Sequence, residues 1–266
     1  MNQQELTEIG SQQQWAGKES YYYEEIDSTN LEVIRRAKQG APHGTLVAAG
    51  YQHLGRGRRG RSWEAEAGES LLFSLLLRPD LSPEYVSGLT LVMALSAAQA
   101  SEAAFDVETG IKWPNDLVLE DKKFGGILTE MRGSGEEGHY LVIGVGLNLH
   151  QKSMTGELAG TAVSLRQVTG RQAEAGKLLS MILGRFEENY GIYLQNKNLG
   201  GLLEEYNSRL VNRDRQVRVL DPQGEFEGIA RGVNADGELL VELPDGKIEK
   251  IYAGEVSVRG MYGYVS

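Results

Sequence analysis

The stretch Ile143-Gly144-Val145-Gly146-Leu147-Asn148-Leu149 places glycine at alternate positions of an apolar run. Such a run predicts a β-strand, and because successive side chains point to opposite faces, both glycines lie on the same face. That face is flat, so a planar group can lie directly against the backbone. A dinucleotide-binding loop would require Gly-x-Gly-x-x-Gly at the start of a helix, and this stretch lacks the third glycine.

Other predicted elements surround this strand. Three strand-like runs with short connections rich in Asp, Lys and Gly precede it, at residues 110–113, 117–119 and 123–131, and with residues 139–149 they predict a mixed or antiparallel sheet. Further strands are predicted at residues 21–26, 45–49 and 71–77. Helices are predicted at residues 27–40, 82–105, 173–197 and 201–210, the first with Thr29 and Glu32 as a capping box.

The two ends of the chain differ in character from its middle. Residues 1–20 are rich in glutamine and show little apolar periodicity, which predicts a short polar lead-in rather than a folded unit. Residues 213–266 contain short strand-like runs separated by Asp-Pro and Asp-Gly pairs, the turn residues typical of a small β-barrel. The sequence therefore predicts a main domain over residues 21–212 and a small C-terminal domain over residues 213–266.

Composition argues against several classes of protein. The 266 residues are 41% hydrophobic, enough to bury a substantial core. The chain has no cysteine, and its four histidines are not spaced as metal ligands, so neither disulfides nor a protein-held metal are expected. We expect a cytoplasmic protein, because the sequence shows neither a secretory signal nor about 20 consecutive apolar residues. The net charge of −10 argues against general binding of nucleic acid.

One short stretch of this acidic chain is strongly basic. It is Gly55-Arg56-Gly57-Arg58-Arg59-Gly60-Arg61, which is followed by Ser62-Trp63. Repulsion among the arginines and the entropy cost of the glycines predict a loop that is poorly ordered until an anion such as phosphate neutralises it. An isolated run of this kind is often a solvated loop or a nucleic-acid-binding segment. Here it directly follows a predicted strand and ends in tryptophan, which favours local chemistry.

Two further motifs are weak when taken alone. In Lys112-Trp113-Pro114-Asn115-Asp116, proline fixes the backbone beside a polar pair, which is also ordinary turn chemistry. In Lys122-Lys123-Phe124-Gly125-Gly126-Ile127-Leu128, a lysine starts a strand whose glycines admit a ligand close to the backbone. A lysine beside a turn is nevertheless usually solvated, so neither motif decides a function without the others.

Taken together, the motifs resemble the biotin protein ligase family from about Tyr23 to the C-terminus. The matching stretches keep the family's order and spacing: Asp27-Ser28-Thr29-Asn30, Gln52 ahead of residues 55–63, residues 112–116 and 123–128, Gly144-Val145-Gly146-Leu147-Asn148, and a barrel that ends near Gly254-Glu255-Val256-Ser257. The resemblance implies an α+β fold, in which a mixed β-sheet flanked by helices, like that of class II synthetases, is followed by an SH3-like β-barrel.

The same resemblance implies an enzyme that joins biotin to ATP and releases pyrophosphate. The biotinyl group then passes from biotinyl-AMP to one lysine of a biotin carrier domain. Biotin's carboxylate has to approach the α-phosphate of ATP, so cations are needed between these two anions. Closure of the arginine loop, packed down by Trp63, would exclude water from the mixed anhydride.

The resemblance also assigns roles to individual residues. The catalytic positions are Lys123, Arg56, Arg58 and Asp116. The biotin contacts are Ser28, Thr29, Asn30, Gln52, Arg56, Gly57, Arg58, Lys123, Gly126, Gly144 and Gly146, and the nucleotide contacts are Arg58, Arg61, Trp63, Lys112, Asn115 and Asn148. Asp116 either orients Lys112 or helps to hold Mg²⁺ on the triphosphate, and the sequence does not choose between these roles.

Two departures from the family pattern stand out. His53-Leu54 replaces the small residues common before the arginine run, which affects the hinge of the loop. The ligases that double as repressors carry a winged helix-turn-helix ahead of the catalytic domain, and about 20 glutamine-rich residues are too few to form one. We therefore expect a monofunctional ligase that does not recognise DNA.

Three alternative functions remain open. One is a lipoate or octanoyl transferase of the same wider fold, and another is an RNA-binding module, which predicts salt-sensitive RNA affinity without pyrophosphate release. The third is a sensor that makes biotinyl-AMP without transferring the biotinyl group. A homodimer through the central sheet, frequent in the family, is open as well.

Overall fold

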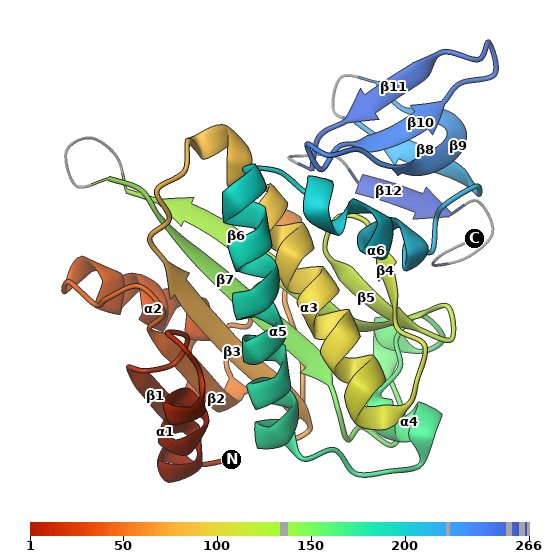
Figure 1. Cartoon of the computed structure of the whole chain (residues 1–266). Coiled ribbons are helices and arrows are strands. Elements are labelled where there is room, and N and C mark those ends of the chain that lie inside the picture. The colour runs from red at the N-terminus through yellow and green to blue at the C-terminus, as the bar shows by residue number, and fades with distance from the viewer. Residues whose placement is uncertain (134–137, 222–223, 254–256, 261–263, 265–266) are drawn as a thin grey trace.

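A seven-stranded mixed sheet lies at the centre of the larger part of the molecule (Figure 1). The computed structural model describes residues 1–133, 138–221, 224–253, 257–260 and 264. The strands lie in the order β1-β2-β3-β7-β6-β5-β4, with β1 and β2 parallel and the other neighbours antiparallel. They confirm the predicted strands, with the bounds β1 Ser20–Ile26, β2 Leu46–Gln52, β3 Ser70–Leu77, β4 Gly110–Lys112, β5 Asp116–Leu119, β6 Lys122–Arg132 and β7 Tyr140–Asn148.

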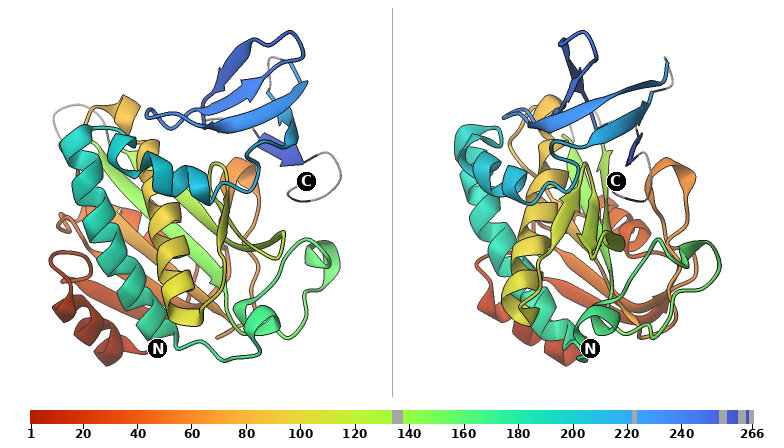
Figure 2. Two further views of the ribbon diagram at one scale, coloured as in Figure 1. Left: turned by 45° about the vertical axis from the view of Figure 1, so that its right-hand side comes forward. Right: turned by 90° about the vertical axis from the view of Figure 1, so that its right-hand side faces the viewer.

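Helices cover both faces of this sheet. Helix α2 (Thr29–Lys38) packs against β2, β3 and β7, while α3 (Gly88–Phe105) and α5 (Ala175–Asn196) lie side by side on the opposite face (Figures 1 and 2). Alternation along β3 explains the two layers, because Leu76 packs with Val33 of α2, whereas Leu75 and Leu77 belong to the main core. The shorter helical segments are α4 (Leu165–Thr169), α6 (Leu203–Ser208) and 3₁₀ turns at Arg58–Gly60, Pro83–Tyr85, Gly156–Leu158 and Gly200–Leu202.

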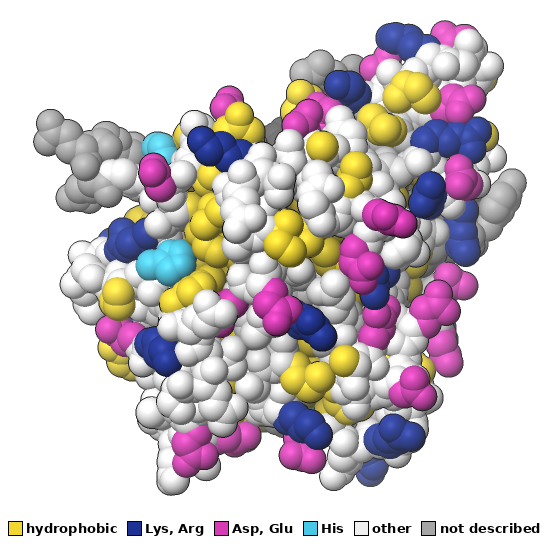
Figure 3. Space-filling view, in the orientation of Figure 1, with side chains coloured by type: hydrophobic (Ala, Val, Ile, Leu, Met, Phe, Trp, Pro, Cys, Tyr) yellow, Lys and Arg dark blue, Asp and Glu magenta, His cyan; other side chains and the backbone are white. Residues whose placement is uncertain are grey.

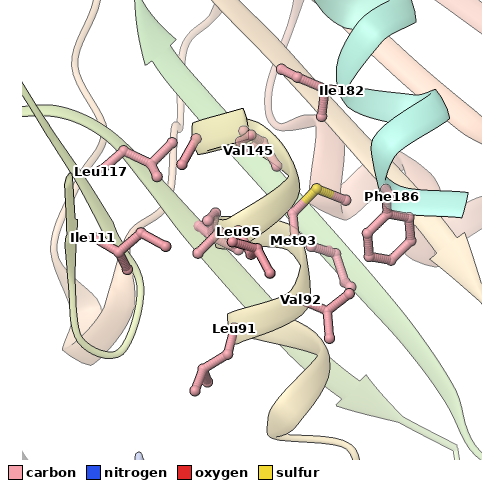
Figure 4. Close-up of a cluster of buried hydrophobic side chains, with 14 of the residues drawn as sticks. Leu91, Val92, Met93, Leu95, Ile111, Leu117, Val145, Ile182 and Phe186 are labelled. Atoms are coloured by element: carbon pink, nitrogen blue, oxygen red, sulfur yellow. The ribbon is translucent and has the colours of Figure 1, made fainter. Parts of the chain in front are cut away.

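The main core fills the space between the sheet and the pair of helices α3 and α5. Figure 4 shows side chains of these elements meeting there, among them Met93 of α3, Phe186 of α5 and Val145 of β7. Helix α3 carries buried residues around almost its whole circumference, because the sheet, α5 and α6 surround it. The part of the opposite face that α2 does not cover therefore remains available for a ligand.

The N-terminal residues form a helix, so the prediction of a polar lead-in is wrong. Helix α1 (Gln3–Gln12) begins after Asn2, whose side-chain oxygen accepts a hydrogen bond from the backbone N–H of Glu5 at 3.0 Å. Leu6 and Ile9 of this helix are buried in the main core. Two apolar residues among many glutamines give little periodicity, but glutamine and glutamate favour helices, and packing against an existing core stabilises one.

The start of α2 differs from the predicted capping box. Ser28 is the N-cap and makes no side-chain cap hydrogen bond, and Thr29 is already the first helical residue. Glu32 forms ion pairs with Arg35 and Arg36, at 2.7 and 2.9 Å, rather than reaching back to the helix start. The polar groups at the beginning of α2 are thus free to contact the neighbouring strands.

The C-terminal residues form a second, smaller sheet, as predicted. Five antiparallel strands lie in the order β11-β10-β9-β8-β12, with the bounds β8 Gln216–Leu220, β9 Phe226–Val233, β10 Leu239–Glu242, β11 Ile248–Ile251 and β12 Ser257–Gly260. This sheet sits at one end of the main domain (Figure 2), where the Trp113 indole N–H donates to the carbonyl of Gly237 at 3.0 Å. Of the family stretch at the end of the barrel, residues 254–256 lie outside the described residues.

The surface over α3 and α5 carries no single broad patch of one charge. Figure 3 shows acidic and basic side chains interspersed on this face. Among the helices that the structure describes, none is both long and apolar enough to cross a lipid bilayer.

One buried carboxylate holds the segment that follows α1. Glu187 of α5 is 7% exposed and accepts hydrogen bonds from the backbone N–H groups of Gln14, Trp15 and Ala16, at 2.9, 2.7 and 2.7 Å. Charge-assisted bonds to backbone N–H groups are stronger than neutral ones, and their loss leaves buried donors unpaired. Glu187 therefore contributes to holding the N-terminal segment, together with the burial of Leu6 and Ile9.

We expect Glu187→Ala to lower the free energy of unfolding by about 2–4 kcal/mol, because three backbone donors lose their acceptor. Urea unfolding followed by circular dichroism measures the change. The control is Glu188→Ala, which removes an adjacent carboxylate that is 59% exposed and paired with Arg185. That variant should stay within about 0.5 kcal/mol of the wild type. Equal losses for both variants would contradict the assigned role of Glu187.

Candidate active site

A pocket lies on the α2 face of the sheet, where β3, β7 and β6 run side by side. In this register Ser74 of β3 pairs with Gly144 of β7, which pairs with Leu128 of β6. Two residues further along β7, Gly146 pairs with Gly126 of β6. Because alternate residues share a face, the three glycines lie on the same side as Val142, which packs with α2. The missing side chains leave a hollow between the start of α2 and the arginine loop, residues 55–63.

The glycines of this hollow cannot be replaced by larger residues without displacing their neighbours. A Cβ on Gly144 would lie 2.0 Å from Asn30 Oδ1, and one on Gly146 would lie 2.6 Å from Cε2 of Trp63. The flat floor predicted from the alternating glycines is therefore present. The planar group that lies against it is the indole of Trp63, which brings the end of the arginine loop into the pocket.

Polar side chains at the start of α2 close one end of the pocket. Gln52 Oε1 accepts from the backbone N–H of Thr29 at 2.7 Å and lies 3.0 Å from its hydroxyl. The hydroxyl of Ser74 lies 2.7 Å from Thr29 Oγ1 and 2.5 Å from Asn30 Oδ1. Ser74 was not among the predicted site residues, although a lone serine inside the apolar run 71–77 was a signal for it. This end can offer both donors and acceptors to a ligand.

The arginine loop forms a small hairpin over the pocket. The backbone N–H of Trp63 donates to the carbonyl of Gly55 at 2.9 Å, and the backbone N–H of Gly57 donates to the carbonyl of Arg61 at 2.8 Å. We expected repulsion among the arginines to keep this loop poorly ordered without an anion. In the structure, a protein carboxylate neutralises part of the positive charge of the loop, because Arg56 lies 3.1 Å from Glu130.

Arg58 is the most enclosed cation of the loop. Its guanidinium donates to Asn115 Oδ1 at 3.0 Å and to the carbonyl of Ala253 from the C-terminal domain. Burial lowers the pKa of Arg58 from its usual value, and the nearby Asp116 carboxylate opposes that shift. An anion placed beside this guanidinium would therefore be strongly stabilised.

Lys123 stands at the same end of the pocket as Arg58. Its ammonium lies 2.7 Å from Asp116 Oδ1 and 5.7 Å from the Trp63 ring. Its backbone is held on both sides, because Lys123 N–H donates to the carbonyl of Thr161 at 2.8 Å and its carbonyl accepts from Val163 at 2.9 Å. A Cβ on Gly126 would lie 3.3 Å from Lys123 Nζ, so this glycine makes room for the lysine side chain.

Asp116 partners Lys123, a contact that is additional to the two roles considered for it. Its other carboxylate oxygen accepts a hydrogen bond from the hydroxyl of Tyr264. Lys112 instead donates to the backbone carbonyl of Tyr264 at 2.6 Å, with its ammonium 3.7 Å from the centre of that ring. Asp116 and Lys112 therefore both contact Tyr264. Tyr264 could not be found from sequence, because it lies 148 positions away from Asp116 along the chain.

The structure brings most of the predicted site residues together. The pocket is lined by every residue assigned to biotin, by Trp63 and Asn115 from the nucleotide set, and by the additional residues Ile127, Leu128 and Val145. Asp116, Arg61, Lys112 and Asn148 do not line it.

Those four residues lie around the pocket for different reasons. Asp116 contacts the ammonium of Lys123, and Lys112 contacts Tyr264. The side chain of Arg61 is exposed on the arginine loop. Asn148 is buried one step beyond the glycines and donates to the carbonyl of Val163 at 3.3 Å. Within the described part of the chain, no group of three or more His, Cys, Asp or Glu residues is placed to hold a metal ion.

Known proteins are similar to this chain in sequence and in fold. Residues 22–148 match the model of the biotin/lipoate A/B protein ligase family, and residues 214–259 match that of the biotin protein ligase C-terminal domain. The bifunctional ligase/repressor BirA of Bacillus spizizenii is 36% identical over 245 residues, which cover 91% of this chain and 74% of that protein. The biotin–[acetyl-CoA-carboxylase] ligase of Paracoccus denitrificans is 30% identical over 239 residues, 88% of this chain and 98% of that protein.

Solved structures give the same result. The biotin protein ligase of Aquifex aeolicus in complex with biotin and ATP aligns with a TM-score of 0.81 at 29% identity, covering 91% of this chain and 99% of that chain. Its apo structure aligns with a TM-score of 0.76 at 26% identity, with the same coverage. The predicted α+β fold with a small C-terminal β-domain is confirmed, and the chain belongs to the biotin protein ligases of the biotin/lipoate A/B protein ligase family.

Proposed function

We propose that this biotin ligase works in two steps. Biotin and ATP first form biotinyl-5′-AMP and pyrophosphate, and a lysine of a biotin carrier domain then receives the biotinyl group. The observation that carries the proposal is the division of the pocket into two ends. Hydrogen-bonding groups around Thr29 and Asn30 close one end, and the cations Lys123 and Arg58 stand at the other.

In the first step, a carboxylate oxygen of biotin attacks the α-phosphorus of ATP, and the bond to the bridging oxygen of pyrophosphate breaks. Lys123 and Arg58 lower the repulsion between the two anions and stabilise the charge that develops on the phosphate. Asp116 holds the Lys123 ammonium in place at 2.7 Å before the substrates arrive. We propose that Lys123 turns toward the substrate oxygens and keeps Asp116 as its positioning partner.

Mg²⁺ is proposed to enter with ATP as part of the substrate. Magnesium commonly takes one or two protein carboxylates together with substrate phosphates and water. Asp116 is a carboxylate close to Lys123, but its two oxygens are occupied by Lys123 and Tyr264. The residues present therefore fit an ion carried mainly by the triphosphate better than one held by the protein alone.

At the other end, the hydrogen-bond pattern suits the ureido ring of biotin. Gln52 uses its oxygen for Thr29, so the amide N–H groups of Gln52 are the part that can donate to the ureido carbonyl. The oxygen of Asn30 lies over Gly144 and can accept from a ureido N–H. A lipoate dithiolane ring has neither amide donors nor a carbonyl, so this pocket favours biotin over lipoate.

The loop and Trp63 are proposed to close over the intermediate. The indole N–H of Trp63 is buried and has no hydrogen-bond partner among the described residues. An unpaired buried donor costs about 1–3 kcal/mol, so a rearrangement that pairs it on substrate binding is favoured. A closed loop would keep water from hydrolysing the mixed anhydride.

In the second step, the ε-amine of the carrier lysine attacks the biotinyl carbonyl, and AMP leaves with the electrons of the broken C–O bond. We propose the cytoplasm as the location, since ATP is the co-substrate. RNA binding is less well supported, because Arg56 and Arg58 are engaged by protein groups at the pocket. Dimerisation through the central sheet stays a prediction.

We expect Lys123→Ala to reduce biotin-dependent pyrophosphate release and carrier biotinylation by about 100-fold or more, because one preorganised charge is lost. Pyrophosphate is measured by a coupled assay, and carrier labelling by mass spectrometry. Lys122→Ala is the matched control, since Lys122 precedes it on β6 and does not line the pocket. Full activity of Lys123→Ala would overturn the proposed role.

Gly144→Ala is expected to weaken biotin binding at least about tenfold, because the added methyl group displaces Asn30 from its position 2.0 Å away. Isothermal titration calorimetry with biotin alone measures the effect. Gly191→Ala makes the same chemical change on α5, where an added Cβ meets nothing within 4 Å. It should leave biotin affinity unchanged and stabilise the helix by up to about 1 kcal/mol. Unchanged affinity in Gly144→Ala would place biotin elsewhere.

A further inference from the structure

A carboxylate at the edge of the pocket needs an explanation, because the substrates of this site are anions. Glu130 lies on β6, and its side chain is only 11% exposed. It shares the pocket face with Gly126 and Leu128, since the three residues alternate along the strand. A buried negative charge this close to an anion site would weaken substrate binding unless it has a task of its own.

Glu130 contacts three side chains, and two of them belong to the pocket. Its Oε2 accepts from Asn30 Nδ2 at 3.0 Å, and its carboxylate lies 3.1 Å from Arg56 Nη1. The third partner is Arg132, whose guanidinium is 2.6 Å away and 46% exposed. Arg132 keeps the carboxylate paired even when Arg56 turns toward another anion.

The bond to Asn30 has a directional consequence. An ionised carboxylate only accepts hydrogen bonds, so it must face the amide nitrogen of Asn30 and not the amide oxygen. The carbonyl of Leu128, 3.4 Å from the same nitrogen, imposes the same orientation. Rotating the amide by 180° would place its oxygen against these two acceptors. The amide oxygen is therefore directed toward Ser74 and Gly144.

We infer that Glu130 is a positioning residue for biotin, which fixes Asn30 so that it presents an acceptor to a ureido N–H. This inference rests on the proposed function, because it assumes that the ureido ring lies beside Asn30. Glu130 does not touch the reacting atoms in this account. Its loss should raise the KM for biotin and leave the KM for ATP nearly unchanged.

The first test compares Glu130→Gln with Arg132→Gln in the full chain, with biotin binding measured by calorimetry without ATP. A glutamine can turn either its oxygen or its nitrogen toward Asn30, so both amide orientations become accessible. We expect Glu130→Gln to weaken biotin binding about tenfold or more, the size of one lost hydrogen bond in a buried site. Arg132→Gln leaves the contact to Asn30 intact and should stay within about threefold of the wild type.

A double-mutant cycle separates positioning from general damage to the fold. Asn30→Asp alone sets two carboxylates against each other and should weaken biotin binding about 100-fold. In Asn30→Asp/Glu130→Gln, the glutamine N–H groups donate to the new carboxylate, which again presents an acceptor to the pocket. The double variant should recover at least about tenfold relative to Asn30→Asp. Thermal melting shows which variants are folded.

The outcomes separate this inference from the proposed function. Absence of biotin binding by the wild type would refute the proposed function itself. Normal binding by the wild type together with an unchanged Glu130→Gln would overturn the role of Glu130 alone. Equal rises in the KM for biotin and for ATP, or no recovery in a folded double variant, would also contradict it.

Discussion

The absence of Cβ atoms on one face of β7 and β6 is the constraint on which the site depends. Gly144 admits the amide of Asn30, Gly146 admits the indole of Trp63, and Gly126 makes room for Lys123. Side chains at these positions would fill the hollow between α2 and the arginine loop. The sheet thus serves as the floor of the pocket, while the opposite face, packed against α3 and α5, holds the fold together.

The second feature of the pocket is the pairing of its cations with protein carboxylates. Two of its cations have a carboxylate partner, Arg56 with Glu130 and Lys123 with Asp116. These partners reduce the repulsion expected among clustered positive charges, which favours the hairpin that the loop forms. In the proposed mechanism, a substrate anion then competes with the carboxylate for each of these two cations. Arg132 contacts the Glu130 carboxylate and Tyr264 contacts that of Asp116, so we propose that both carboxylates keep a partner during this exchange.

Most of the fold could be predicted from sequence, because strands with alternating or apolar runs and glycine-rich connections have strong local signals. Helix α1 was missed because Leu6 and Ile9 are too few to show periodicity, and their burial depends on a core built by distant residues. Thr29 matched a capping box locally, yet Gln52, 23 residues further along the chain, takes its N–H. Sequence patterns over a few neighbouring residues do not predict contacts between positions so far apart in the chain.

The candidate site, like the fold, could be predicted only in part from the sequence. The family motifs indicated which residues line the pocket, but not which charges pair within it. Glu130 follows Gly126 and Leu128 with the period of a strand, so its face could have been inferred, whereas its contact with Asn30 could not. The contacts of Ala253 and Tyr264 with Arg58 and Asp116 depend on how the C-terminal domain packs on the main sheet. Sequence alone does not determine that packing.

The central claim is that one pocket places a biotin carboxylate beside the α-phosphate of ATP. Exchange of radioactive pyrophosphate into ATP by the wild-type protein, measured with no carrier present, tests this directly. The account predicts exchange that requires biotin and Mg²⁺ and that lipoate does not support. Exchange driven by lipoate, or none in a protein that binds both biotin and ATP, would contradict the account.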